Sequence, residues 1–283
     1  MSTQITTAFV EQYKANLMHL SQQKGSRLRG TVRTEEVTGK NAYVERLGAA
    51  TAVDATSRHD DTPQIDSEHS RRRLSLVTSR WADLIDNPDK VRMLINPESD
   101  YAMAGANALG RRLDDHIVVA ASGTAYAGVA GGTTVALPSA QKIAHGSAGL
   151  TLTKLISAKE ILDTNEVDPM DRYLVLGAGQ MADLLADTTI TSADYNTIKA
   201  LVKGEIDTFM GFKFVHSQRL ENDGTSDLVL AYQKNAIRLG VGREPMVRIT
   251  ERADKNYSTQ VFVEMDMGAT RVEDEAVVQI ACN

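Results

Sequence analysis

The stretch that decides the fold begins at Gly204 and reads Gly-Glu-Ile-Asp-Thr-Phe-Met-Gly-Phe-Lys-Phe-Val-His-Ser. Three more blocks follow it: Ala231-Tyr-Gln-Lys-Asn-Ala-Ile-Arg-Leu-Gly-Val-Gly, then Glu251-Arg-Ala-Asp-Lys, and finally Gly268-Ala-Thr-Arg-Val-Glu-Asp-Glu-Ala-Val-Val-Gln-Ile. From Pro245 onwards the pattern predicts strands at 246–251, 258–267 and 276–281, whereas 227–241 fits either a strand or a helix. The last third of the chain is therefore expected to be mainly β-structure.

Composition excludes several functional classes. The 283 residues carry a net charge of −6, and 42% of them are hydrophobic. A protein that neutralises many phosphates is normally basic, so extended nucleic-acid binding is disfavoured. The single cysteine, Cys282, allows no disulfide within the chain and no Cys-rich metal site. We expect Cys282 to be a small buried or terminal residue.

Through the middle of the chain, helices and strands are expected to alternate. The apolar spacing predicts a helix over about 150–165, with one side formed by Leu152, Leu155, Ile156, Lys159 and Leu162. A strand is expected at 171–176, helices at 179–186 and about 192–202, and a strand at 211–217.

The longest predicted helix covers 96–121. Asn96 suits the N-cap and Pro97 the first helical position. Interior glycines weaken a helix, so Gly105 and Gly110 indicate a place where another element comes close. Tyr101, Ala108, Leu113, Ile117 and Ala120 mark the side expected to be buried.

The N-terminal part predicts an arm and an outlying hairpin. Ile5, Phe9, Tyr13, Leu17 and Leu20 recur at helical spacing, and a polar segment containing Gly25 follows them. We expect residues 1–30 to add little stability to a monomer. Residues 31–80 read as a long hairpin whose centre, 54–70, is too polar to form a core alone. A projecting hairpin that packs on a neighbouring subunit explains this composition.

These blocks and spacers resemble the major capsid proteins of tailed bacteriophages, with the HK97-like fold. Further likenesses are Val37-Thr-Gly-Lys-Asn, Asp60-Asp-Thr-Pro, Ser70-Arg-Arg-Arg-Leu and Ile85-Asp-Asn-Pro-Asp. The resemblance implies an α+β chain with four parts. They are an N-terminal arm (1–33), an extended β-hairpin loop (34–80), a peripheral domain with a long spine helix (81–122 and 246–283), and an axial domain (123–245).

The resemblance also implies a structural protein and not an enzyme, so no catalytic residue, cofactor or metal is assigned. It implies hexamers and pentamers in an icosahedral shell around double-stranded DNA, located in the virion and assembled in the host cytoplasm. The expected partners are other copies of the chain, a separate scaffolding protein, a portal protein and a decoration protein. No sequence-specific DNA binding and no membrane are expected.

Candidate inter-subunit residues come from the arm and the hairpin. They are Phe9, Tyr13, Leu17, Asp60, Asp61, Arg71, Arg72 and Arg73. The arginine run has two other interpretations: phosphate contact, or salt bridges with the hairpin's own acids, Asp54, Asp60, Asp61, Asp66 and Glu68. The salt-bridge interpretation is favoured over phosphate contact. Reversal of all three arginines is expected to leave the monomer folded.

Two patterns suggest other chemistry. Gly177-Ala-Gly-Gln-Met-Ala182 follows a strand and precedes a helix, as in dinucleotide-binding turns. We find no continuing βαβ unit, so a nucleotide-dependent oxidoreductase is the alternative and not the main hypothesis. Asp114, Asp115 and His116 resemble an acid–base cluster, but the expected arrangement is two solvated acids beside a partly buried histidine. A tube or decoration protein of a virion is the remaining alternative.

Overall fold

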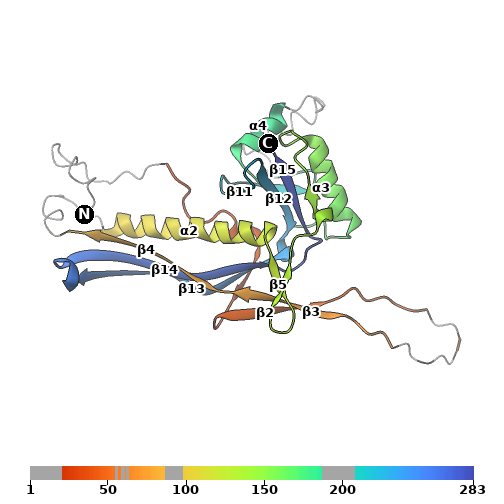
Figure 1. Ribbon diagram of the computed structural model, residues 1–283, viewed down its shortest axis with the longest axis horizontal. Helices are drawn as coiled ribbons and strands as arrows, with labels where there is room; N and C mark the ends of the chain where they lie inside the picture. The colour runs from red at the N-terminus through yellow and green to blue at the C-terminus, as the bar shows by residue number, and fades with distance from the viewer. Residues whose placement is uncertain (1–20, 55–56, 59–60, 62–63, 87–97, 187–207) are drawn as a thin grey trace.

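The computed structural model describes residues 21–54, 57–58, 61, 64–86, 98–186 and 208–283. The expected helices at 5–20 and 192–202 lie outside these residues. The described part is elongated, with a long helix and sheet at one end and a smaller α/β body at the other (Figure 1). A narrow hairpin extends from the region where the two meet.

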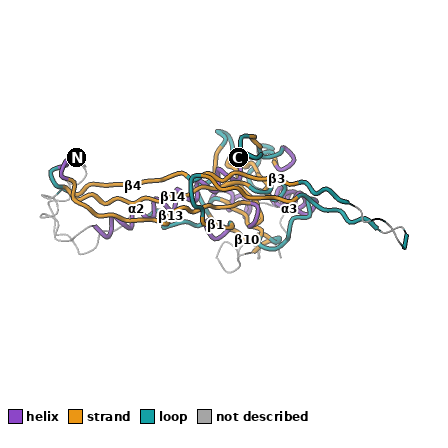
Figure 2. The backbone as a smooth tube through the Cα atoms, turned by 90° about the horizontal axis from the view of Figure 1, so that it is seen from below, coloured by secondary structure: helices purple, strands orange, loops and turns teal. Residues whose placement is uncertain are grey.

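The long end consists of helix α2 (Glu98–Ser122) on one face of a four-stranded sheet, which we call the spine sheet. Its strands, in spatial order, are β1 (Arg33–Glu36), β13 (Ile237–Arg252), β14 (Ser258–Arg271) and β4 (Val77–Ile85). Strands β13, β14 and β4 run side by side along the helix (Figures 1 and 2). The main core lies between helix and sheet, where Leu109, Leu113 and Ile117 are buried.

The smaller body is built on a seven-stranded mixed sheet, which we call the axial sheet. Its strands are β7 (Lys142–Ile143), β15 (Val277–Cys282), β12 (Asp227–Gln233), β8 (Arg172–Leu176), β10 (Phe212–His216) and β9 (Thr208–Phe209), with β11 (Glu221–Asn222) paired to β12. Helices α3 (Leu152–Thr164) and α4 (Ala178–Ala186) complete it. A second core contains Leu155 and Leu162 of α3, Leu184 of α4, and sheet residues such as Val229.

A third sheet carries the projecting hairpin, and we call it the loop sheet. Its order is β2 (Asn41–Leu47), β3 (His69–Ser75), β5 (Ala125–Ala127) and β6 (Thr133–Val135). Strands β2 and β3 are antiparallel, with Tyr43 opposite Arg73. Short 3₁₀ turns occur at Arg29–Thr31, Ser139–Gln141, Lys234–Ala236 and Ala253–Lys255.

Most of the expected elements are confirmed, and the ambiguous 227–241 region is two strands joined by a 3₁₀ turn. The hairpin is shorter than expected. Residues 33–36 leave it and pair in parallel with β13, because Val32 and Val37 are buried. In α3 the expected face is partly wrong: Ile156 is exposed and Lys154 is buried. The Lys154 ammonium donates to the carbonyls of His145, Ala148, Gly149 and Ala281 at 2.8–2.9 Å, which compensates its burial.

The two helical glycines permit close packing on α2, as expected. A Cβ on Gly105 would lie 2.5 Å from the Trp81 ring, and one on Gly110 would lie 2.6 Å from the Gly25 backbone. The buried side of α2 differs in detail. Tyr101, Ala108 and Ala120 are only half-buried, whereas Leu113 and Ile117 are buried as expected.

Candidate functional site

The candidate site is the region where the loop sheet meets the end of α2 and the start of β15. Of the candidate interface residues, Phe9, Tyr13, Leu17 and Asp60 lie outside the described residues, and Asp61 is exposed. The three arginines lie on β3 and alternate between the two faces of the loop sheet. That alternation separates Arg72 from Arg71 and Arg73.

Arg72 points into the protein and is 4% exposed. Its guanidinium pairs with the Asp274 carboxylate and also donates to the Val272 carbonyl at 3.5 Å. Burial lowers the pKa of Arg72, and the nearby Asp274 charge opposes that shift. The expectation that all three arginines can be reversed with the fold intact is therefore wrong for Arg72, since a glutamate there would face a buried carboxylate.

Asp274 also holds a second guanidinium, that of Arg271, which is fully buried. The Arg271 Nε donates to Asp274 Oδ1 at 2.6 Å. Its terminal nitrogens donate to three backbone carbonyls, those of Ala121, Gly123 and Val135. One carboxylate and two arginines thus tie together β3, the C-terminal end of α2, β6 and the turn before β15. Sequence reasoning missed the Arg271–Asp274 pair. The block contains four charged residues, and Asp274 lies between the exposed Glu273 and Glu275, so the sequence carries no local signal of its burial.

Arg71 and Arg73 point to the opposite face of the loop sheet. Arg71 pairs with Glu45 at 2.9 Å and lies 5.5 Å from the Tyr43 ring centroid. Arg73 lies 4.7 Å from the Tyr126 ring centroid. The acid paired with Arg71 is therefore on the neighbouring strand β2, directly opposite it. Arg71 therefore forms a salt bridge within the hairpin, as expected, but its partner is Glu45 and none of the five acids that were expected.

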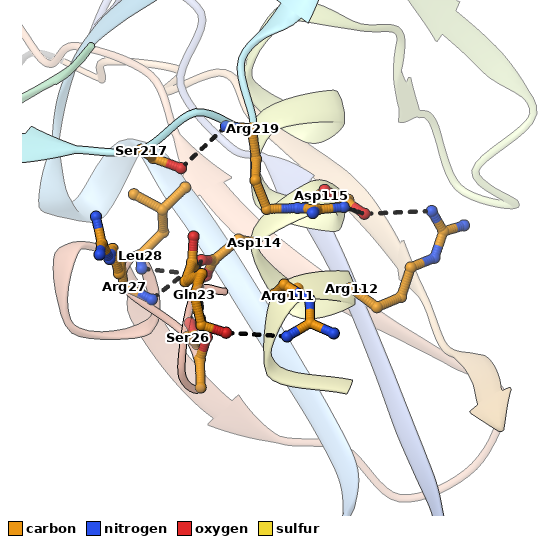
Figure 3. A network of polar contacts seen from close by, with 11 residues as sticks. Gln23, Ser26, Arg27, Leu28, Arg111, Arg112, Asp114, Asp115, Ser217 and Arg219 are labelled. Atoms are coloured by element: carbon orange, nitrogen blue, oxygen red, sulfur yellow. Dashed lines mark hydrogen bonds and ion pairs between the residues drawn. The ribbon is translucent and has the colours of Figure 1, made fainter. Parts of the chain in front are cut away.

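A second polar network joins the N-terminal segment to α2 and to the axial sheet (Figure 3). Asp114 is fully buried and accepts hydrogen bonds from Ser26 Oγ, the Arg27 amide and the Leu28 amide, at 2.5, 3.0 and 3.1 Å. The Gln23 side chain donates to the same carboxylate at 2.5 Å. The expectation that Asp114 is solvated is wrong, because it satisfies the amides of a chain segment that packs against the helix.

The same network corrects the expectation for residues 1–30. Leu28 is 0% exposed and belongs to the main core. Arg29 pairs with Glu244 on β13, which lowers the pKa of that carboxyl through the hydrogen bond from Arg29. Residues 23–30 are therefore part of the folded body, and only the role of the preceding residues stays a prediction.

Asp115, the next residue, links α2 to the segment that follows β10. The Arg219 guanidinium donates to both Asp115 oxygens, at 2.5 and 2.6 Å, and Arg112 lies 3.7 Å away. His116 is half-buried, as expected, and its Nε2 has no hydrogen-bond partner among the described residues. Burial lowers the His116 pKa, and the Arg112 charge lowers it further. The contacts of Asp115 thus join α2 to the segment that contains Arg219, and they form no acid–base site.

The comparisons with known proteins give the family. A model of the phage capsid protein family matches residues 5–283. The chain belongs to this family. It is a structural protein of the phage capsid in the virion, and not an enzyme.

Solved capsid structures have the same α+β fold, that of HK97-like capsid proteins. The capsid of cyanophage P-SCSP1u aligns over 99% of this chain and 94% of its own, with a TM-score of 0.74 and 17% identity. A solved structure from Mycobacterium phage Che8 aligns over 96% of this chain and 97% of its own, with a TM-score of 0.71 and 18% identity. The capsid asymmetric unit of cyanophage Pam1 aligns over 98% of this chain and 97% of its own, with a TM-score of 0.70 and 12% identity. No curated protein matches the chain.

Membership of the capsid family excludes the alternative hypothesis of a nucleotide-dependent oxidoreductase. The geometry of the Gly177 turn also argues against a bound nucleotide. Strand β10 pairs in parallel with β8, so the expectation that no βαβ unit continues after the Gly177 turn is wrong. However, the Gly177 amide donates to the Gln180 side chain at 3.1 Å, and Gln180 in turn donates to Asp227 at 2.9 Å. A phosphate there would have to displace Gln180 and approach a carboxylate.

Two further observations concern the described part of the capsid protein. None of its helices has both the length and the apolar character needed to cross a membrane. Cys282 is buried as expected, and burial raises the pKa of its thiol to about 11. A thiol with so high a pKa remains protonated and unreactive near neutral pH.

Proposed function

We propose that this capsid protein is the major shell subunit, which self-assembles into the hexamers and pentamers of an icosahedral capsid. The observation that carries the proposal is the family match over residues 5–283, together with a fold shared with solved capsid subunits. A projecting hairpin on a rigid body is the geometry that a subunit needs in order to reach its neighbours in a closed shell.

The candidate interface residues are part of this proposal. Arg71 and Arg73 are supported by their outward position on the loop sheet, and Asp61 by its exposure in the projecting hairpin. Phe9, Tyr13, Leu17 and Asp60 are proposed on the sequence pattern alone. Arg72 is withdrawn from the set because Asp274 of its own chain pairs with it.

The proposed domain boundaries follow the family architecture: 1–33, 34–80, 81–122 with 246–283, and 123–245. Two structural facts bear on them. Strand β1 lies in the spine sheet, and β15 lies in the axial sheet. A revised division would therefore group residues 33–36 with the spine helix, and residues 277–282 with the axial body.

Other partners are proposed by class only. A scaffolding protein, a portal protein and a decoration protein are the expected companions of such a subunit. The enclosed double-stranded DNA would be held without sequence-specific contacts, which the net charge of −6 supports.

Sedimentation and negative-stain electron microscopy of the purified chain, alone and with its candidate scaffolding protein, test the proposal. Closed shells, or rings with fivefold and sixfold symmetry, are expected. Tubes, or small particles bound to a shell of another protein, would instead support a tube or decoration protein. A stable dimer or tetramer would contradict assembly altogether.

A further inference from the structure

The outward face of the loop sheet carries an ordered row of tyrosine and arginine. Tyr43 on β2 lies directly opposite Arg73 on β3, and Arg73 lies directly opposite Tyr126 on β5. Arg71 lies two residues along β3 on the same face, beside the Tyr43 ring. We call Tyr43, Arg71, Arg73 and Tyr126 the Tyr/Arg face.

This face has the properties of a binding surface. Tyr43 and Tyr126 are 39% and 40% exposed, which is high for aromatic side chains on a sheet. Arg73 stacks on the Tyr126 ring, and its guanidinium forms no ion pair within the described part of the chain. Tyrosine and arginine are enriched at the centres of protein interfaces, and an arginine whose charge has no acid beside it favours an acidic partner.

The same chain carries a suitable acidic surface. Two turns meet where the Asn165 side chain donates to the Glu275 carbonyl at 3.5 Å. They expose four carboxylates, Glu166 and Asp168 after α3, and Glu273 and Glu275 before β15. Within the described part of the chain, none of these four forms an ion pair. We call them the acidic edge.

The two surfaces lie on opposite sides of the loop base. Arg72 points through the inner side of the loop sheet to Asp274, which lies between Glu273 and Glu275. Arg71 and Arg73 point to the other side because side chains alternate along β3. In Figure 1 the strands of the loop sheet lie below α3. One copy cannot easily join its own two surfaces, whereas two copies arranged head to tail can.

We propose that the Tyr/Arg face of one copy binds the acidic edge of the next copy around a capsomer. This inference rests on the proposed function. It adds which two surfaces of the subunit meet, namely the Tyr/Arg face and the acidic edge. Charge complementarity selects a second copy as the occupant. Among the described residues, Arg73 has no acid of its own chain beside it, and Arg71 pairs only with the exposed Glu45. Both arginines would then meet Glu273, Glu275, Glu166 and Asp168. A heterologous contact of this kind closes into a ring when the rotation between copies permits it.

Reciprocal charge reversal tests the inference. Four chains are compared by sedimentation and electron microscopy: the wild type, R71E/R73E, E273R/E275R, and the variant with all four substitutions. Each pair alone should reduce the assembled fraction by at least about tenfold, because like charges would meet at every repeat of the contact. The fourfold variant should recover most of the assembly, since the attraction is restored with its sign inverted.

Three controls separate folding, general charge and the proposed contact. R71Q/R73Q removes the positive charge without placing a glutamate beside Glu45, and should give an intermediate loss. R248E/K255E changes the net charge equally at exposed positions on the distant end of the spine sheet. Circular dichroism melts should show all variants folded.

The outcomes are distinct. Failure of the wild type to assemble would overturn the proposed function and this inference with it. Normal assembly of R71E/R73E, or lack of recovery in the fourfold variant with both pairs defective, would overturn the inference alone. Recovery in the fourfold variant supports it, even if R248E/K255E is impaired at some other contact.

Discussion

Gly240 on β13 and Gly268 on β14 are direct partners across the spine sheet, and the chain between β3 and β4 crosses over the pair. A side chain on Gly240 would meet Leu74 and Val37, and one on Gly268 would meet the Ser75 carbonyl. Both glycines belong to the sequence blocks that identified the family. Their role is to let the loop sheet lie directly on the spine sheet.

Substitution of these glycines should therefore have unequal effects. Gly268→Ala is expected to destabilise more, because a backbone carbonyl cannot move aside as the Leu74 side chain can for Gly240→Ala. Overpacking of this kind typically costs about 1–3 kcal/mol. Chemical denaturation of both variants checks the order. Gly179→Ala is the matched control, since nothing lies within 4 Å of its Cβ position; equal stability of all three would refute the packing argument.

The glycines of α2 give a second comparison. Gly110→Ala places a Cβ against the Gly25 backbone, so residues 23–28 should detach from the helix. Gly105→Ala meets the Trp81 and Val263 side chains, which should cost stability but leave that segment bound. Limited proteolysis near Gly25 measures detachment. Faster cleavage is expected in Gly110→Ala only, and equal cleavage of the two variants would contradict this assignment.

The buried carboxylate Asp274 should matter more than either of its arginines. Asp274→Asn leaves two guanidinium groups without a negative charge, which should cost about 3–5 kcal/mol of unfolding free energy. Arg72→Met should cost less, because Arg271 still pairs with Asp274 and methionine fills part of the space. A double-mutant cycle between Arg72 and Asp274 measures their coupling. A coupling near zero would show that burial, and not the ion pair, holds the loop base.

Asp114 and Asp115 are adjacent but should respond differently. Asp114→Asn turns an acceptor of several donors into a group with only one oxygen, so we expect a loss of about 1–3 kcal/mol and faster amide exchange at Arg27 and Leu28. Asp115→Asn weakens a half-exposed pair with Arg219, for which about 1 kcal/mol is an upper expectation. Hydrogen exchange and denaturation test both. Protection at Leu28 that is unchanged in Asp114→Asn would contradict the proposed anchoring.

His116 predicts a pH effect on stability. Its pKa is lowered in the folded chain, mainly by burial, so the unfolded chain binds more protons as the pH falls below about 6.5. Stability should therefore be complete above that pH and decrease as the pH falls towards the folded pKa. The decrease between about pH 7.5 and 5.5 should be smaller in His116→Gln. Identical pH profiles for the two proteins would show that His116 is not responsible.

Much of the architecture could be predicted from the sequence because it depends on local patterns. The small-residue run with Gly105 and Gly110 marked a helix with close neighbours, and alternating residues after Pro245 marked strands. The candidate interface surfaces were harder to predict from the sequence. A run of three arginines looks uniform in sequence, yet pleating buries Arg72 and turns Arg71 and Arg73 outward.

The sequence alone determined the fold family, through the resemblance of its blocks, and most of the helices and strands, because periodicity acts over a few residues. Only the tertiary structure decided which charges are internal. Arg271 pairs with a neighbour in sequence, but the carbonyls that satisfy it come from the distant residues Ala121 and Val135. The environment of a charge depends on segments that folding brings together, and those contacts leave no local pattern in the chain.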